Sequence, residues 1–390
     1  MNDRFIEDCQ GMVQCPSESG HEEAAAIFAK TVMERLGFDR VWIDDVGNVL
    51  GQIKGNGPTT IMLEGHLDTV GIGNRSDWTF DPHGAEIHDG RMYGRGTSDM
   101  KCALMAMIHG AAALIPFKNH LCGNIVVAGV VCEEEFEGVA QGMILDEINP
   151  DLVIIGEASE LSVKIGQRGR AEVVVITHGK SAHSSNPSAG INAVKKMNRL
   201  LGKIETMELP RDEFLGPAII EVTDIRSEPY PGSSVIPSLC RATFDRRLLP
   251  GETEAVVLDP IREIIQGLKA EDPDFSAEVS LAEARQVCYT GKTIDAKRFF
   301  PAWRFSEEDD FVKQALAALG QAGLPEKISH YSFCTDGSQC AGIRGIPTLG
   351  FGPSRENLAH VVDEYVEIDQ LEKARTGYTA IVAKMLNCTI

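Results

Sequence analysis

Residues 123–138, GNIVVAGVVCEEEFEG, decide the fold class of this chain of 390 residues. An apolar run continues to Cys132 and then ends abruptly in three glutamates. Continuous apolar strands are typical of parallel sheets with helices on both faces, because neither face of such a strand meets water. Similar short runs lie at 60–63, 151–155 and 346–351, and helical patterns alternate with them. We therefore predict an α/β fold with a mostly parallel central sheet covered by helices.

The middle of the chain, residues 168–289, follows a different pattern. Its strand-like segments AEVVVITHG, PAIIEVTDI, CRATFDRRL and FSAEVSLAE are separated by two helical stretches, near 191–205 and 252–269. Segments of the first type resume after it. The pattern therefore predicts that residues 1–167 and 290–390 form one domain, and that residues 168–289 form an inserted α+β domain.

The charge balance excludes several classes of partner. Lys and Arg number 37 against 57 Asp and Glu, which gives a net charge of −20. Such a field repels phosphate backbones and anionic lipids, so we expect neither a nucleic acid nor a membrane as partner. The first residues, MNDRFIEDCQ, lack the basic and apolar regions of a secretion signal, which predicts a cytoplasmic protein. Ten cysteines without paired zinc-ribbon spacing indicate free thiols.

Histidine and acidic residues follow the ends of the apolar strands. His66 and Asp68, in EGHLDTV, are two positions apart, so their side chains would share one face of an extended backbone. One could bind a metal ion while the other orients it, as carboxylates do for metal-binding imidazoles. Taken alone, the pair is better interpreted as two polar residues at the end of a strand.

Four further segments carry acids or a histidine at comparable places. Asp99 precedes an apolar helix, where it could simply be the N-cap. The adjacent Glu134 and Glu135 would point in different directions, as a base and a metal ligand require, although charge runs are usually solvated. Glu157 follows the run at 151–155, and His360 lies in AHVVDE after the run at 346–351.

The common position of these residues favours one site. The carboxyl ends of strands in an open α/β sheet meet at one edge, where such folds bind ligands. Two imidazoles with several carboxylates suit zinc, cobalt or manganese. The sequence therefore predicts a centre of two divalent metal ions, most simply zinc.

The motifs EGHLDTV, GRGTSDMK, CEEEFEG, VIIGEAS, HGKSAHSS, SSVIPSLCRATFDRRLLPGE and GFGPSRENLAHVVDE resemble, in order and spacing, those of the M20 metallopeptidase family. This family contains acetylornithine deacetylase, succinyl-diaminopimelate desuccinylase, aminoacylase and glutamate carboxypeptidases. Within it, the segments IGQRGRAEVVV, KSAHSS and FFPAW resemble a bacterial hydrolase subgroup linked to selenium metabolism.

The resemblance implies a role for each motif residue. It implies that Asp99 bridges two metal ions. His66 and Glu157 would complete the ligands of one ion, and Glu135 and His360 those of the other. Asp68 would orient His66, and Glu134 would be the general base. The middle domain would be a lid through which two subunits pair, and its His183 would stabilise the tetrahedral intermediate.

Two positions depart from the family pattern. Ser234 stands where the family's lid has asparagine, and Ser338 stands where several members have arginine in TDGR. Arg247 is the remaining candidate for binding a substrate carboxylate, because a guanidinium offers two parallel donors. A surface ion pair of Arg247 with Asp245 or Glu252 is an equal alternative.

The resemblance therefore implies a metal-dependent hydrolase that cleaves the amide bond of a small N-acyl amino acid. Glutamate at 157, where the family's dipeptidases tend to carry aspartate, favours deacylase or carboxypeptidase chemistry. A dipeptidase or carboxypeptidase with the same site is the nearest alternative, and a non-catalytic peptide- or metal-binding homologue is a third. The resemblance also implies a homodimer.

Overall fold

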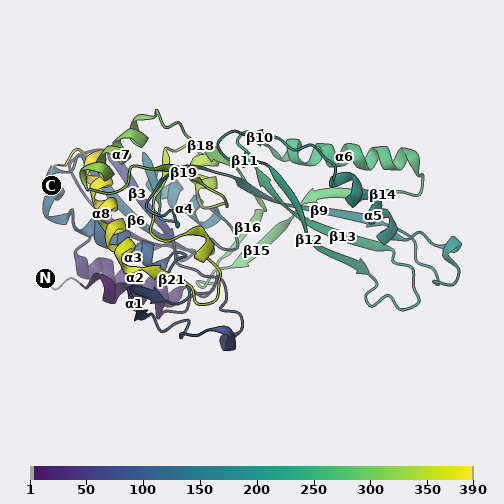
Figure 1. The fold of residues 1–390 in the computed structure, drawn as a ribbon, viewed down its shortest axis with the longest axis horizontal. Coiled ribbons are helices and arrows are strands. Elements are labelled where there is room, and N and C mark those ends of the chain that lie inside the picture. Colours follow the sequence, from purple (N-terminus) through teal and green to yellow (C-terminus); the bar gives the residue numbers. More distant parts are fainter. Residues whose placement is uncertain (1–3, 389–390) are drawn as a thin grey trace. The chain divides into compact units, whose positions relative to one another are not determined.

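The computed structural model describes residues 4–388 and divides them into two compact units (Figure 1). Unit 1 contains the residues up to Gln167, Arg285–Asp295 and the residues from Trp303 on. Unit 2 contains Arg168–Ala284 and Ala296–Ala302. The chain therefore crosses between the units more often than the sequence pattern suggested. Residues 296–302 belong to unit 2 because β17 (Phe299–Phe300) pairs with its strand β9 (Gly169–His178).

A nine-stranded mixed sheet forms the core of unit 1. Its four central strands are parallel neighbours, and each overlaps one of the four apolar runs identified in the sequence. Antiparallel pairs complete both edges, which confirms the α/β class. In spatial order the strands are β1 (Arg40–Ile43), β2 (Val49–Ile53), β6 (Gly123–Val130), β3 (Thr59–His66), β7 (Leu152–Ile155), β20 (Thr348–Gly350), β8 (Val163–Gln167) and β18 (Trp303–Arg304), with β19 (Ile328–Tyr331) also beside β8.

Helices pack on this sheet and on one another. Helix α3 (Lys101–Ala112) contacts β3 and β6, and α8 (Ile368–Met385), yellow in Figure 1, packs against α3. Nearly every side chain of α3 is buried, which explains why its sequence is apolar on all sides. The other helices of unit 1 are α1 (Phe5–Val13), α2 (Glu23–Leu36), α4 (Val139–Ile148) and α7 (Asp310–Gln321).

Unit 2 is a smaller α+β structure. Its sheet has the order β12 (Ile219–Glu228), β13 (Leu239–Leu248), β9 and β14 (Ser276–Leu281). Apolar side chains of α5 (Ala193–Ile204) and α6 (Glu254–Glu271) join those of the sheet in one buried cluster. The inserted α+β arrangement predicted from the sequence is therefore present.

Small sheets complete the two units. One is β21 (Tyr365–Glu367), β5 (Arg91–Tyr93) and β4 (Glu86–His88); the pairs are β10 (Arg211–Asp212) with β11 (Gly216–Pro217), and β15 (Glu283–Val287) with β16 (Thr293–Lys297). Among the described residues, no helix combines the length and apolar character that a membrane crossing would need.

Candidate metal centre

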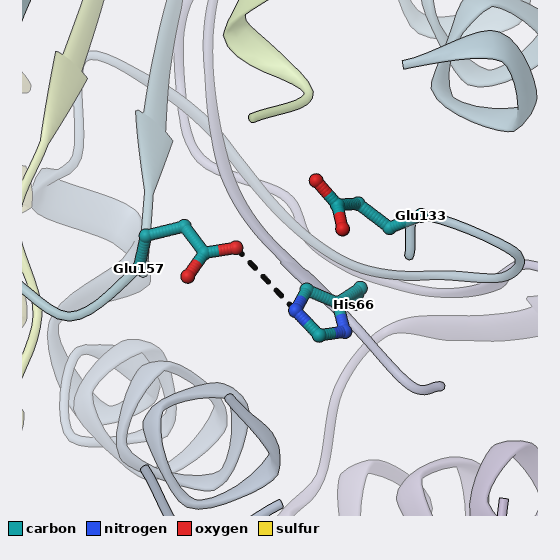
Figure 2. A group of neighbouring side chains, drawn as sticks. All are labelled: His66, Glu133 and Glu157. Carbon is teal, nitrogen blue, oxygen red and sulfur yellow. Dashed lines mark ion pairs between the residues drawn. The ribbon is translucent and has the colours of Figure 1, made fainter. Parts of the chain in front are cut away.

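The carboxyl ends of β3 and β7 bring a histidine and a glutamate together. His66 is the last residue of β3, and Glu157 follows β7 by two residues. The two strands are parallel neighbours, so these ends meet at one edge of the sheet. The His66 Nε2 atom lies 3.4 Å from Glu157 Oε1 (Figure 2). Both side chains are buried, so the pair lies away from bulk water.

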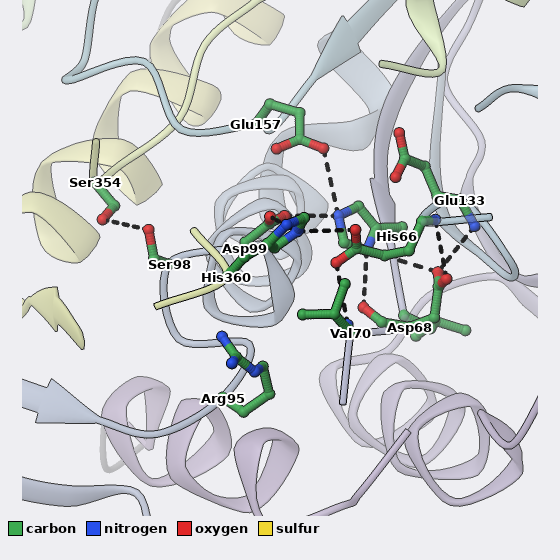
Figure 3. A network of polar contacts seen from close by, with 12 residues as sticks. His66, Asp68, Val70, Arg95, Ser98, Asp99, Glu133, Glu157, Ser354 and His360 are labelled. Carbon is green, nitrogen blue, oxygen red and sulfur yellow. Dashed lines mark hydrogen bonds and ion pairs between the residues drawn. The ribbon is translucent and has the colours of Figure 1, made fainter. Parts of the chain in front are cut away.

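Asp99 lies between the two histidines of the site. Its Oδ1 atom is 2.9 Å from His66 Nε2, and its Oδ2 atom is 3.2 Å from His360 Nε2 (Figure 3). Each carboxylate oxygen thus faces a different imidazole, as a residue bridging two ions requires. The helix after it, α3, has Met100 as its N-cap residue, without a side-chain capping bond. Asp99 is therefore not the helix cap that its sequence position allowed.

The two glutamates that reach the site are Glu133 and Glu134, each one position earlier in the sequence than the predicted Glu134 and Glu135. Glu134, and not Glu135, accompanies His360, with Oε2 of the glutamate 2.9 Å from Nε2 of the histidine. Glu133 groups instead with His66 and Glu157, where ligand atoms of all three lie within 4.8 Å of one another. His66, Asp99 and Glu134 form a second such group. Glu135 belongs to neither group found among the described residues.

The cause of this shift is a turn. The prediction assumed an extended backbone, in which adjacent side chains point to opposite sides. Strand β6 instead ends at Val130, and Cys132 adopts a φ of 57°. The Phe136 amide then donates to the Cys132 carbonyl over 3.0 Å, as in one turn of a helix. Successive side chains in such a turn do not alternate, so Glu133 and Glu134 both reach the site.

Asp68 contacts His66 through its backbone carbonyl and the glutamate turn through its carboxylate. The His66 Nδ1 atom lies 2.9 Å from the Asp68 carbonyl oxygen and 3.6 Å from its Oδ1. The carboxylate accepts the amide N–H groups of Glu133 and Glu134, over 3.0 and 3.1 Å. It also accepts the Ser19 hydroxyl over 2.7 Å. Asp68 therefore positions the glutamate turn as well as the histidine.

A buried ion pair supports the turn that carries Asp99. Glu364 Oε1 accepts the amide N–H groups of Ser98 and Asp99 over 2.8 and 3.1 Å. Its Oε2 lies 2.6 Å from Nη1 of Arg95, and both side chains are almost fully buried. Glu364 also follows His360 by four residues on the same loop. The pair therefore joins the loops of two candidate ligands.

The acids of the site strongly perturb one another. Burial and the charge of Asp99 raise the pKa of Glu134 and of Glu157 to about 7. Burial also raises the pKa of Glu133 well above its usual value. Hydrogen bonds to Asp99 and Glu134 raise the pKa of His360 to about 10. Like charges gathered in a buried place are what divalent cations neutralise, so this donor set fits a metal centre.

Two candidates in unit 2, His183 and Ser234, lie on neighbouring segments of the chain. His183 and Val235 form an isolated bridge, and the Ser184 amide donates to the Ser234 carbonyl over 2.8 Å. His183 Nδ1 accepts the Ser185 amide over 3.1 Å, and both His183 and Ser234 are exposed. His183 and Ser234 are therefore neighbours within the unit.

Arg247 and Ser338 each form a hydrogen bond within their own unit. Arg247 Nε donates to Asp245 Oδ1 over 2.6 Å, which is one of the two surface pairs considered from the sequence. The other candidate partner, Glu252, pairs with Arg246 instead. Ser338 is buried, and its hydroxyl donates to the Glu137 carbonyl over 3.1 Å, so it stabilises the chain after the glutamate turn.

Two features were missed from the sequence. Glu133 was not distinguished from its neighbours because a run of three glutamates carries no internal register. Its place directly after the apolar run was the available signal. Arg95 and Glu364 lie 269 positions apart, and no local pattern connects them.

Comparison with known proteins agrees with the geometry. The model of Peptidase family M20/M25/M40 matches residues 62–384. A protein named YgeY from Escherichia coli K12 is 36% identical over 384 residues, which are 97% of this chain and 93% of that protein. Succinyl-diaminopimelate desuccinylase 2 of Ruegeria sp. TM1040 is 28% identical over 97% of this chain and 94% of its own.

A solved structure extends the likeness to the fold. Aminopeptidase PepT from Bacillus cereus superposes with a TM-score of 0.76 at 21% identity, covering 98% of each chain. The strand-end histidines and acids, the family match and the near full-length relative at 36% identity lead to one conclusion. This chain belongs to peptidase family M20/M25/M40 and is a metal-dependent hydrolase.

Proposed function

We propose that this protein uses two divalent metal ions to hydrolyse the amide bond of a small N-acyl amino acid. The observation that carries the proposal is the orientation of Asp99, whose two carboxylate oxygens face His66 and His360 separately. His66, Asp99 and Glu157 would hold one ion, and Asp99, Glu134 and His360 the other. The mixture of imidazole and carboxylate ligands favours zinc, with cobalt or manganese as substitutes.

The positions of the glutamates support new roles for two of them. The prediction of Glu134 as base and Glu135 as ligand is replaced by Glu133 as base and Glu134 as ligand. When bound, the ions supply an acidified water and polarise the substrate carbonyl. Glu133 would take the proton from the attacking water and return it to the leaving amine. Its side chain is buried beside His66 and Glu157, so the transfer would be shielded from bulk solvent.

Unit 2 would provide a lid and a dimer interface. Its edge strand β12 is exposed along most of its length, and Ile219, Val222 and Ile225 on it are large exposed apolar side chains. An exposed edge strand is a template for pairing with another strand, and a second copy could supply one. In such a dimer His183 would act on the substrate bound to the partner subunit, and Arg247 with Ser234 would contact the substrate.

The substrate class comes from the relatives. Succinyl-diaminopimelate desuccinylase is named for removing an acyl group from an amino acid, and it aligns along most of this chain. A deacylase therefore receives more support than a dipeptidase or carboxypeptidase. A panel of N-acyl amino acids, N-carbamoyl amino acids and dipeptides would test this. We expect the N-acyl amino acids to give the highest kcat/KM, and preferential cleavage of dipeptides would overturn the deacylase assignment.

Two glutamate variants test the mechanism. Glu133→Gln should retain its metal content and lose roughly 10²- to 10⁴-fold in kcat, as removal of a positioned base does. Glu135→Gln is the matched control, because it makes the same change two residues along and should keep both metal and turnover. Metal loss in Glu133→Gln, or full activity of that variant, would contradict its role as base.

A further inference from the structure

A small cavity in unit 1 lies next to the candidate metal centre. It has a volume of about 220 Å³. It is lined by Pro16, Glu18, His21, Thr69, Val70, Ile72 and His83. The Val70 amide donates to Oε1 of Glu134 over 3.3 Å, so one wall of the cavity directly contacts a proposed metal ligand. A group held in this cavity would therefore lie beside the reacting amide.

The wall formed by residues 16–21 is fastened to the strand end that carries the site. The Ser17 hydroxyl donates to the Leu67 carbonyl over 2.8 Å, and the Thr69 amide donates to the Ser17 carbonyl over 2.9 Å. The Ser19 hydroxyl bonds the Asp68 carboxylate. These bonds hold Glu18 between two anchored serines.

The opposite wall, residues 70–72, is supported from behind. Trp78 Nε1 donates to the Ile72 carbonyl over 2.8 Å, and Arg95 Nη2 reaches the Gly71 carbonyl over 3.4 Å. The cavity is therefore bounded by segments fixed in place by hydrogen bonds, as preformed ligand sites are.

The polar side chains of the lining include one carboxylate and two imidazoles. The Nδ1 atom of His83 is buried and has no hydrogen-bond partner within residues 4–388. Burial lowers the pKa of His83, so its imidazole is neutral at neutral pH. Glu18 is the only acidic residue of the lining, which contains no lysine or arginine.

The cationic side chains of Lys101 and Arg95 do not line the cavity. The charge of each lowers the pKa of the His83 imidazole. The Lys101 ammonium donates to the Cys15 carbonyl over 2.6 Å, and Arg95 is paired with Glu364. Glu18 therefore provides the charge that faces an occupant.

We propose that this cavity is a subsite for an ammonium-bearing side chain of the substrate, with Glu18 as its counter-ion. The proposal rests on the hydrolytic function proposed above. The apolar side chains of Pro16, Val70 and Ile72 would contact the methylene groups of such a side chain, as apolar walls do for lysine-like stems. The net charge of −20 also favours the approach of a cation.

Matched substrates and matched variants test the subsite. N-acetyl-L-lysine and N-acetyl-L-norleucine differ at the end of the amino acid side chain, and ε-aminocaproyl-glycine and caproyl-glycine differ at the end of the acyl group. We expect the ammonium-bearing member of at least one pair to have the higher kcat/KM. In Glu18→Gln this preference should fall about fivefold, as for loss of a partly exposed ion pair. Glu307→Gln makes the same charge change at an exposed position of unit 1 and should keep the preference.

Direct binding separates this proposal from the proposed function. Calorimetric titration of the metal-loaded protein with L-lysine and with L-norleucine does not depend on turnover. If no amide is cleaved, yet lysine binds more weakly to Glu18→Gln than to wild type, the hydrolase proposal fails and the subsite stands. If amides are cleaved, yet neither the kcat/KM ratio nor lysine binding changes in Glu18→Gln, the subsite is wrong. A wild-type preference for a carboxylate-bearing side chain would also overturn it.

Discussion

Replacing Glu364 by glutamine removes the charge that joins two loops of the metal centre. Glutamine keeps the size of the side chain and one acceptor oxygen for the Ser98 and Asp99 amides. The Arg95 guanidinium, 4% exposed, would lose the carboxylate 2.6 Å away and remain buried with its charge uncompensated. The perturbation is therefore mainly electrostatic.

The expected cost is large for one substitution. Breaking a buried ion pair by removing one partner typically costs about 3–5 kcal/mol, because the other charge stays buried. Burial raises the pKa of Glu364 to about 7, so the comparison belongs at a pH near 8, where the carboxylate is ionised. We expect the free energy of unfolding of the metal-free protein to fall by about 3 kcal/mol. Metal affinity should fall as well, because Asp99 and His360 lie on the joined loops.

Urea denaturation of chelator-treated protein measures the stability, and metal titration measures the affinity. The double variant Arg95→Met/Glu364→Gln is the control, because it removes both charges and should recover part of the lost stability. A change of less than about 1 kcal/mol in Glu364→Gln, or a double variant less stable than the single one, would refute this account of the pair.

Three further outcomes are expected. The pKa values of Glu134, Glu157 and His360 lie above their ordinary values in the metal-free fold, so this fold binds extra protons. The free energy of unfolding of the metal-free protein should therefore fall from about pH 5 to about pH 9 in urea titrations, and a rise over that range would contradict the pKa directions. Asp68→Asn should lower metal affinity or activity about 10- to 100-fold in metal titration and turnover assays, because one of its acceptor oxygens becomes a donor facing amide N–H groups. Mixing inactive His183→Ala with inactive Glu133→Gln under subunit exchange should restore about a quarter of wild-type activity, and no recovery from folded, metal-loaded, exchanging proteins would exclude action of His183 on the partner's substrate.

The fold was largely predictable because its signals are local. The runs at 60–63, 124–132, 151–155 and 346–351 are mostly apolar, and they form neighbouring strands of the central sheet. The change of pattern at residue 168 coincides with the start of unit 2. The far end of the insertion was less clear, because the short strand β17 returns to β9 only after residues 285–295 have rejoined unit 1.

The candidate site was predictable in composition but not in register. His66, Asp99, Glu157 and His360 follow strands or precede a helix, where sequence patterns indicate position well. The choice among the three glutamates depended on a turn at Cys132, whose positive φ no residue in the segment announces. The bonds from Asp68 to the glutamate turn and from Glu364 to the Asp99 turn depend on tertiary contacts. Such contacts are absent from any local pattern.

Metal content per chain tests the central claim most directly. Elemental analysis of metal-replete, dialysed protein should find about two divalent ions per chain in the wild type, because Asp99 faces two separate histidines. Glu135→Gln should retain about two ions, whereas Glu134→Gln should lose at least part of one, because the Glu134 carboxylate lies beside His360. A wild-type protein that never binds more than about one ion would contradict the two-metal centre. Loss of metal in Glu135→Gln with retention in Glu134→Gln would contradict the assignment of Glu134 as ligand.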